Sequence, residues 1–277
     1  YANEGMIITT TAKLYEEAEA SLEIIKVTHF DTPLGKVLIC KVKENGNVQI
    51  AGPTNTSDIK EICCDMLGFG IDTVIIDGSI DRKASASPLI SDAAILATGA
   101  VLSRDINKVV EETAHVVDLY NLQQLEDDFL KNTILYEENV NRLLVVDYEF
   151  NIFQIELETG ISNSDFINEK IDENIRYVYI PGALTFSTLM NIDIKKFKNV
   201  TFIIKDGTKV FINPGKWQTL KRQGFNVRVL NKINLIGITL NAYSPKGYFF
   251  NPGVLMEKMK KSIKDIDIVD IYFGGEV

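Results

Sequence analysis

The sequence predicts an α/β fold in which strands of a parallel sheet alternate with helices. Short apolar runs recur between segments of helical period that are about ten residues long. One run, Thr73–Ile76, consists of four β-branched residues without polar alternation, which is typical of a strand buried on both faces. With 277 residues, 45% of them hydrophobic, the chain is long enough for one large or two ordinary domains of this class.

The first half of the chain is predicted to mix strands and helices. The expected strands are residues 5–10, 22–28, 36–43, 48–51 and 73–76, with a further apolar run at 93–97. The expected helices are residues 12–20, 54–67 and 104–119. Asn45–Gly46 predicts the turn of a hairpin, and Ser103 is expected to cap the third helix.

An acidic, polar stretch from about Asn121 to Asn139 is predicted to be a helical connector, and the strand signals restart after it. The expected strands are then 142–146, 176–180, 200–204, 227–230, 235–240 and 266–271, with helices near 184–190 and 254–262 and a strand end plus helix at 211–224. We therefore expect two domains: a P-loop-like α/β domain with the helical connector at residues 1–136, and a smaller parallel-sheet α/β domain at residues 137–277.

A short motif occurs twice in the second half, at residues 211–215 and 249–253, each time before a helical segment. In both copies an Asn is followed by Pro and Gly. Asn is a good N-cap and Pro suits the first helical position, so capping explains the repeat. Binding of anions at the two helix N-termini is the alternative.

Composition excludes several classes of protein. A net charge of −9 argues against non-specific binding of nucleic acid, and the sequence has neither a membrane-spanning apolar run nor a signal peptide. Cys40, Cys63 and Cys64 lack the spacing of a disulfide framework or a zinc site, which favours a cytoplasmic protein with reduced thiols. His115 lies within a predicted helix and is expected to be a surface or packing residue.

The polar loop after Thr73–Ile76 is the candidate site, because ligands of open α/β sheets bind at the carboxyl ends of strands. Asp77 would take the place of a Walker B aspartate and hold Mg²⁺ directly or through water, while Arg82 and Lys83 would contact phosphate. The predicted cofactor-binding residues are Asp77, Gly78, Ser79, Asp81, Arg82 and Lys83, with Asp77 also the metal ligand. The alternative is an ordinary strand that ends in a glycine turn, with Asp77 as a cap.

A P-loop-like domain would also need the phosphate loop GxxxxGK[S/T], and no such run occurs between Tyr1 and Val277. That loop normally follows the first strand. Since the chain starts with Tyr1 and enters a predicted strand almost at once, we expect the loop to lie in an N-terminal piece ahead of Tyr1. The expected cofactor is ATP or GTP with Mg²⁺.

Several stretches together resemble a bacterial family. They are residues 77–88 (DGSIDRKASASP), 92–105 (DAAILATGAVLSRD) and 109–115 (VVEETAH), with AGP at 51–53 and NAYSP at 241–245. The family is identified as the smaller reactivase component of lysine 5,6-aminomutase. The resemblance implies an N-terminal phosphate loop and two partners, a mismatch-repair-type ATPase and an aminomutase that depends on cobalamin and pyridoxal phosphate.

The favoured function is therefore an accessory factor that couples nucleotide binding to the release of damaged cofactor from an aminomutase. Two alternatives stay open at this point. One is a non-catalytic module that binds a small molecule or a protein, and the other is a P-loop-type enzyme resembling ligases. A phosphate loop ahead of Tyr1 would favour the accessory factor or the enzyme. An isolated chain is not expected to turn over a substrate.

Overall fold

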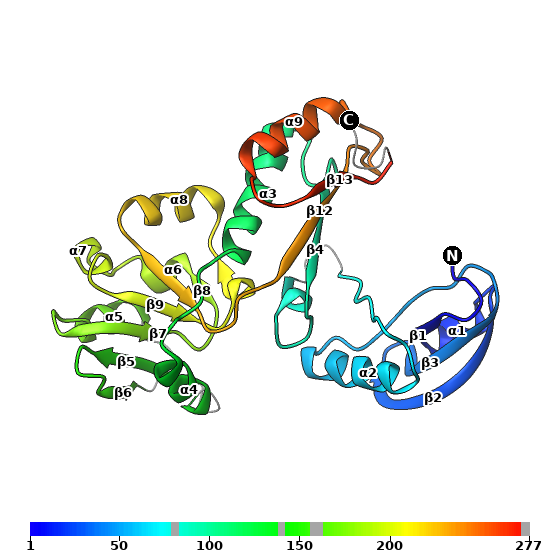
Figure 1. Ribbon diagram of the computed structural model, residues 1–277, viewed down its shortest axis with the longest axis horizontal. Coiled ribbons are helices and arrows are strands. Elements are labelled where there is room, and N and C mark those ends of the chain that lie inside the picture. Colours follow the sequence, from blue (N-terminus) through cyan, green and yellow to red (C-terminus); the bar gives the residue numbers. More distant parts are fainter. Residues whose placement is uncertain (79–82, 138–141, 156–162, 273–277) are drawn as a thin grey trace. The chain divides into compact units, whose positions relative to one another are not determined.

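A computed structural model describes residues 1–78, 83–137, 142–155 and 163–272 (Figure 1). The chain divides into two compact units, Tyr1–Ser85 and Ala86–Val277. The division falls within a short 3₁₀ helix, η1 (Lys83–Ala86).

The first unit is built on an antiparallel three-stranded sheet with the strand order β1–β3–β2. Its elements are β1 (Ile7–Thr11), α1 (Ala12–Glu16), β2 (Ser21–Thr32), β3 (Gly35–Glu44) and α2 (Thr56–Gly68). The side chains of β3 alternate between two small cores, because successive residues of a strand face opposite sides. Cys40 belongs to one core and Ile39 to the other, which Ile62 and Met66 of α2 close. An antiparallel sheet is not the parallel arrangement expected of a P-loop-like domain, so that expectation is not confirmed.

The hairpin of this unit lies at a different place from the predicted one. Its turn is at Pro33 and Leu34, between β2 and β3. Gly46 instead exchanges backbone hydrogen bonds with Ala2, and residues 48–51 form no strand. A Cβ on Gly46 would lie 2.5 Å from the backbone nitrogen of Ala20, so glycine here permits close approach of two backbone segments.

The predicted buried strand Thr73–Ile76 is wrong. These residues have no partner in a sheet. Val74 packs against the core that α2 closes, whereas the next side chain, Ile75, is 89% exposed. The run therefore places one side chain against a core and the next in solvent, and it is not a strand buried on both faces.

The second unit contains three sheets within its described residues. The five-stranded sheet, of order β11–β9–β7–β5–β6, consists of β5 (Leu143–Asp147), β6 (Ile152–Ile155), β7 (Ile175–Tyr179), β9 (Thr201–Ile204) and β11 (Asn226–Val229). Its β11, β9 and β7 run parallel and its β7, β5 and β6 antiparallel. A parallel three-stranded sheet, of order β13–β12–β4, consists of β4 (Ala94–Gly99), β12 (Leu235–Asn241) and β13 (Ile268–Asp270). A parallel pair joins β8 (Leu184–Thr185) to β10 (Val210–Phe211).

Helices cover these sheets. They are α3 (Ile106–Tyr120), α4 (Asp128–Glu137), α5 (Asn163–Lys170), α6 (Phe186–Leu189), α7 (Ile194–Phe197), α8 (Pro214–Arg222), α9 (Pro252–Ser262) and the 3₁₀ helix η3 (Gly207–Lys209). The α/β class predicted from the sequence is confirmed, although the largest sheet is mixed and not parallel throughout.

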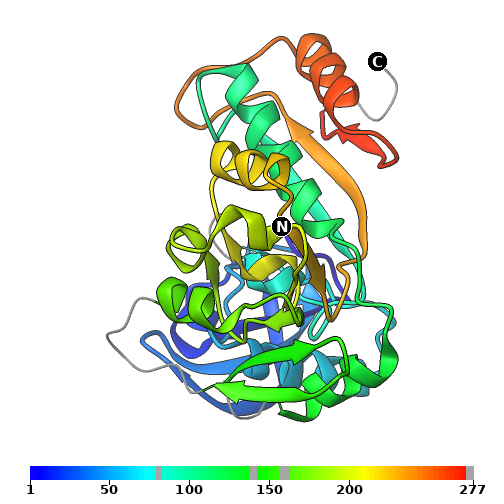
Figure 2. The same cartoon turned by 90° about the vertical axis from the view of Figure 1, so that its left-hand side faces the viewer.

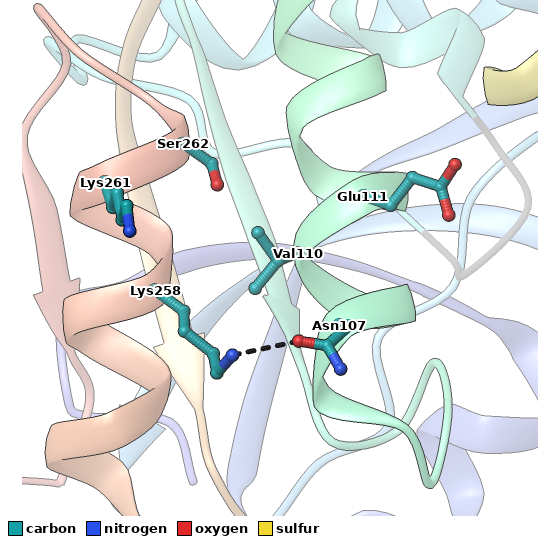
Figure 3. A pocket seen from close by; sticks show the side chains of 6 residues that line it. All are labelled: Asn107, Val110, Glu111, Lys258, Lys261 and Ser262. Carbon is teal, nitrogen blue, oxygen red and sulfur yellow. Dashed lines mark hydrogen bonds between the residues drawn. The ribbon is translucent and has the colours of Figure 1, made fainter.

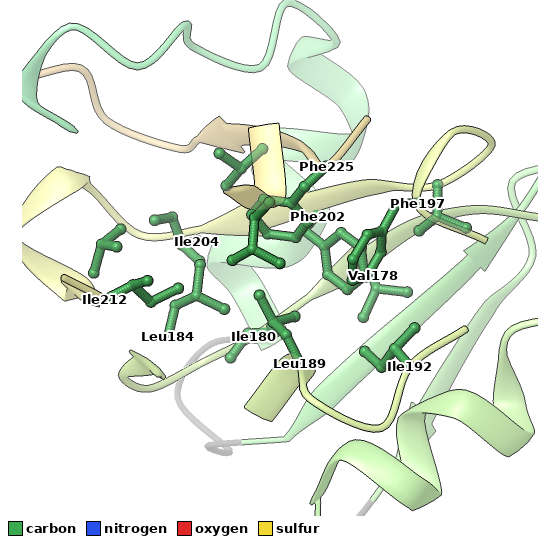
Figure 4. Close-up of a cluster of buried hydrophobic side chains, with 14 of the residues drawn as sticks. Val178, Ile180, Leu184, Leu189, Ile192, Phe197, Phe202, Ile204, Ile212 and Phe225 are labelled. Atoms are coloured by element: carbon green, nitrogen blue, oxygen red, sulfur yellow. The ribbon is translucent and has the colours of Figure 1, made fainter. Parts of the chain in front are cut away.

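The five-stranded sheet is buried on both faces, which explains its uninterrupted apolar runs. On one face Val178 and Phe202 pack with Leu189, Phe197 and their neighbours (Figure 4). On the other face α4 covers the sheet with Leu130 and Ile134. The three-stranded sheet has its own core, in which Ile238, Leu240 and Ile268 pack with buried residues of α3 and α9.

The boundary expected near residue 137 does not separate the units, because it lies inside the second one. β4 precedes residue 137 and pairs along its length with β12, which follows it. Helix α3 contributes Val109 to the core with α9, beside which it lies, and Leu119 to the core of the five-stranded sheet (Figures 1 and 2). The restart of strand signals at residue 142 marks a second sheet and not a second domain.

The predicted helix caps at the repeated motif are confirmed. The Asn213 side chain accepts a hydrogen bond from the Lys216 amide (2.9 Å), and Asn251 accepts one from the Val254 amide (3.1 Å). Pro214 and Pro252 occupy the first turn in each helix. The cap of α3 is Asp105 and not Ser103.

Candidate functional site

The residues of the predicted nucleotide site are not assembled into a site by the described structure. Asp77 and Gly78 are exposed and follow a segment that pairs with no strand of the described chain, so Asp77 does not end a parallel strand. Ser79, Asp81 and Arg82 lie outside the described residues. Lys83 begins η1, and its side chain is also outside the description. Across the described ranges, no three His, Cys, Asp or Glu side chains gather closely enough to hold a metal ion.

The carboxyl edge of the β13–β12–β4 sheet is the better candidate. All three strands are parallel, so their carboxyl ends meet at one edge, where α/β sheets bind ligands. Three segments form it: residues 99–105 between β4 and α3, residues 241–251 between β12 and α9, and residues 270–272 at the end of β13. We call these three segments the carboxyl edge.

The ends of β4 and β12 are held in close contact. Gly99 adopts a φ of +152°, and a Cβ at this position would lie 1.9 Å from the carbonyl oxygen of Asn241. The amide of Ala100 donates to that same oxygen at 2.8 Å. Only glycine fits here, and it lets the chain turn away from β4 toward the start of α3.

The loop from Asn241 to Asn251 folds back on itself as a small hairpin. Backbone hydrogen bonds join Ser244 to Tyr248 and Ala242 to Phe250. Its turn has Pro245 at the second position and Gly247 at the fourth, which the sequence SPKG favours. The hydroxyl of Tyr248 donates to the carbonyl of Ala100 at 2.5 Å, so this hairpin is fastened to the loop after β4.

Arg104 lies against this hairpin, with its guanidinium carbon 5.2 Å from the ring centroid of Tyr248. The side chain is exposed and makes no hydrogen bond or ion pair with any described residue. Stacking on a ring holds a guanidinium in place and leaves its N–H groups available, so Arg104 can still bind an anion.

Three exposed aromatic side chains lie together on the carboxyl edge. The rings of Tyr243 and Phe249 are stacked with centroids 5.8 Å apart, and Tyr272 meets Tyr243 edge to face at 5.3 Å. They are 44%, 68% and 63% exposed, respectively. We call Tyr243, Phe249 and Tyr272 the aromatic platform. Such a group presents flat π surfaces to solvent, and exposed apolar groups of this kind mark recognition sites.

The edge holds few groups for acid–base chemistry. Asp270 is buried, with 3% exposure, and accepts a hydrogen bond from the Tyr272 amide at 2.8 Å, so it helps to place that ring. His115 belongs to α3 and contacts the carbonyl of Ile212 through Nε2 at 2.8 Å. It is 5% exposed and packs edge to face with Trp217, so the expected packing role is confirmed.

A hollow of about 340 Å³ lies between α3 and α9 (Figure 3). It is lined by Asn107, Val110, Glu111, Lys258, Lys261 and Ser262. The ammonium of Lys258 donates to Asn107 at 2.9 Å across the hollow, so it already has a partner within the chain. The hollow shows no group of aligned donors for one ligand, and we assign it no role.

Local sequence signals for the carboxyl edge exist, but they are weak one at a time. The glycine after the apolar run at 93–97 and the SPKG turn could have been recognised as loops at strand ends. What sequence reasoning missed is that these loops meet, since this depends on the pairing of β4 with β12, far apart in the chain.

No helix in the described part of the chain is long and apolar enough to cross a membrane. Comparisons with protein-family models, curated proteins and solved structures found no match to the chain.

Proposed function

We propose that this protein is a non-catalytic binding component that recognises a nucleotide-type ligand at the carboxyl edge and acts on a partner protein. The observation that supports this most is that the aromatic platform and Arg104, which has no anionic partner among the described residues, both belong to the edge where parallel sheets bind ligands. A planar base would stack on the platform, and such stacking is worth about 1–3 kcal/mol per base.

The anionic part of the ligand would meet Arg104. The guanidinium offers a bidentate edge to phosphate while the Tyr248 ring supports its face. Helix α3 begins two residues after Arg104, but the Asp105 carboxylate already caps its N-terminus, so the guanidinium would supply the positive charge for the phosphate. The proposal thus keeps ATP or GTP with Mg²⁺ as the cofactor and moves the main contacts away from the loop at Asp77.

The resemblance to the aminomutase reactivase family supplies the proposed role and partners. In this proposal the chain binds nucleotide, works with a mismatch-repair-type ATPase and reactivates a cobalamin-dependent aminomutase in the cytoplasm. The free thiols Cys40, Cys63 and Cys64 are compatible with a reducing compartment. The alternative of a P-loop-type enzyme has less support, because the described part of the first unit is an antiparallel sheet with one long helix.

Calorimetric titration of the full chain with Mg-ATP and Mg-GTP tests the proposal. Tyr243→Ala and Phe249→Ala should each weaken binding about tenfold or more if a base stacks on these rings. Asp77→Ala is the matched control and should bind as the parent chain does. Loss of binding in Asp77→Ala, with normal binding by both ring variants, would return the site to the loop at residues 77–83. Absence of binding by the parent chain would refute nucleotide recognition by the chain alone.

A further inference from the structure

A second arginine of the second unit, Arg176, lies near three aromatic rings at the five-stranded sheet. The guanidinium carbon of Arg176 lies 6.0 Å from the ring centroid of Tyr148, 5.4 Å from that of Phe150 and 5.0 Å from that of Tyr177. Arg176 and Tyr177 belong to β7, and the other two rings belong to the turn between β5 and β6. We call these four residues the Arg176 surface.

Arg176 has no anionic partner among the residues that the structure describes. It is half-buried, yet it makes no hydrogen bond or ion pair with any residue in the part of the chain that the structure describes. A guanidinium carries five N–H donors in a plane, and rings that stack on its faces satisfy none of them. The same rings reduce its contact with water and hold its orientation. The N–H groups of Arg176 are therefore available to an acceptor that is not among the described residues.

The backbone of the neighbouring turn is strained in a way that keeps one ring in place. Phe150 has a φ of 64°, which is the left-handed region that a bulky side chain rarely adopts. Its amide donates to the Asp147 carbonyl at 3.2 Å, so Asp147–Phe150 is a tight turn, and Phe150 is its left-handed last residue. Hairpins of this type usually have glycine there. A phenylalanine at such a position points to a role for the ring, because strain of this kind concentrates at functional sites.

Asp147 fixes the turn. Its carboxylate accepts hydrogen bonds from the amides of Glu149 and Asn151, both at 2.9 Å, and from the Asn151 side chain at 2.8 Å. The bond from the Asn151 side chain, with those from the two amides, lowers the pKa of Asp147 below its usual value. The carboxylate is thus committed to the backbone of the turn and is not engaged with Arg176.

The charges around the surface narrow the class of partner. Asp147, Glu149, Asp172 and Glu173 all lie within four residues of the three rings or of Arg176 in sequence. A run of acidic residues would be repelled by these carboxylates, whereas one carboxylate could reach Arg176 alone. The rings of Tyr148 and Phe150 are 54% and 37% exposed and offer apolar contact beside the guanidinium. Tyr and Arg are enriched among the residues that dominate protein interfaces.

We propose that the Arg176 surface docks a segment of a partner protein in which a single carboxylate is flanked by apolar side chains. The carboxylate forms a bidentate pair with Arg176, and the flanking side chains pack on Tyr148 and Phe150. This surface and its ligand are separate from the carboxyl edge, so either proposal can fail without the other.

The test uses the full chain labelled with ¹⁵N at arginine, with the Arg176 Nε–H signal assigned by its loss in Arg176→Gln. The probes are the capped peptides acetyl-Leu-Glu-Leu-amide and acetyl-Leu-Gln-Leu-amide and inorganic phosphate, each titrated to about 10 mM, since a contact this small is expected to be weak. The Glu peptide should shift the Arg176 signal saturably and leave the Arg104 signal in place. It should bind at least about tenfold more tightly than the Gln peptide.

Variants distinguish the contribution of the Arg176 guanidinium to peptide binding from an effect of misfolding. Arg176→Gln should abolish Glu-peptide binding, and Arg176→Lys should weaken it because a lysine is not bidentate. Arg142→Gln, on the same hairpin, is the matched control and should bind normally. Unchanged Trp217 fluorescence and melting temperature show that each variant is folded. Equal binding of both peptides, an equal response to phosphate, no saturable shift with the Glu peptide, or normal binding by Arg176→Gln would each overturn the proposal.

Discussion

The strained turn at Phe150 predicts that a glycine variant is more stable than an alanine variant, which reverses the usual order of stability. In a helix or strand, glycine is less stable than alanine by about 0.5–1 kcal/mol, because it loses more backbone freedom on folding. At Phe150 the φ of 64° should reverse this order. Phe150→Gly and Phe150→Ala both remove the ring and its contact with Arg176, so the comparison between them isolates the backbone.

The size of the effect follows from two opposing terms. Left-handed backbone costs an L-residue roughly 1–2 kcal/mol, and glycine avoids this cost. Its greater loss of chain entropy offsets about 0.5–1 kcal/mol of that advantage. The Gly variant should therefore be more stable than the Ala variant by about 1 kcal/mol. For a folding unit of this size, such a difference corresponds to about 3 °C in melting temperature.

Urea unfolding monitored by fluorescence is a suitable assay, because the chain has one tryptophan. Trp217 is wholly buried in the core that also holds Val145 of β5 and Val178 of β7, so its emission reports on the unit that contains the turn. The control is the same pair of substitutions at Asn132, an exposed position within α4, where Ala should be the more stable by about 1 kcal/mol. If Phe150→Ala proves more stable than Phe150→Gly, the turn is not strained and the functional argument built on Phe150 loses its basis.

Three further predictions concern buried polar groups and thiols. Burial, with the charge of Asp206 as a second cause, raises the pKa of Tyr120 to about 12. As the pH rises, the phenol therefore ionises first in the unfolded chain, so the stability that it contributes is complete below about pH 10 and lost by about pH 12. Tyr120→Phe should remove about 2–3 kcal/mol of this loss from the curve of unfolding free energy against pH. Tyr136→Phe is the control and should leave the curve unchanged, because Tyr136 is 80% exposed. Asp206 is fully buried and accepts from Ser87 Oγ (2.7 Å) and the Thr208 amide (2.9 Å), so in urea unfolding Asp206→Ala should cost about 3 kcal/mol and Ser87→Ala about 1. In labelling with a thiol reagent, the exposed Cys64 should react first, and Cys63 should react more slowly because burial raises the pKa of its thiol. Cys40 is fully buried, which raises its pKa to about 11, so it should react only when the first unit unfolds. Early labelling of Cys40 would contradict the packing of β3.

Local sequence signals predicted local structure well. The caps at Asn213 and Asn251 follow from the side chain and the three residues after it, and both are present. The third helix was expected at 104–119 and is observed at Ile106–Tyr120, because a long apolar face defines it within one stretch of chain.

The errors have a common physical cause, since each depended on a distant partner. Thr73–Ile76 has the composition of a buried strand, but no other strand lies beside it. The boundary near residue 137 was inferred from the order of strand and helix signals along the chain. In the structure β4 pairs with β12, although all strands of the five-stranded sheet lie between these two in the sequence. We propose the carboxyl edge as the site for the same reason, because ligands of α/β sheets bind where the carboxyl ends of neighbouring strands meet.

The two arginines at the centre of the proposals share one property that bears on what the protein does. Arg104 and Arg176 are each held against aromatic rings, and neither pairs with a carboxylate of the described chain, although acidic residues outnumber basic ones by 38 to 29. In a chain this acidic, an unpaired cation would readily acquire an internal partner, and stacking on rings instead keeps its N–H groups for a ligand. One such arginine lies at a sheet edge suited to a small molecule, and the other lies beside exposed rings suited to a protein segment. The two proposals together describe a component that binds a small ligand at one place and a partner at another, as the proposed accessory factor would.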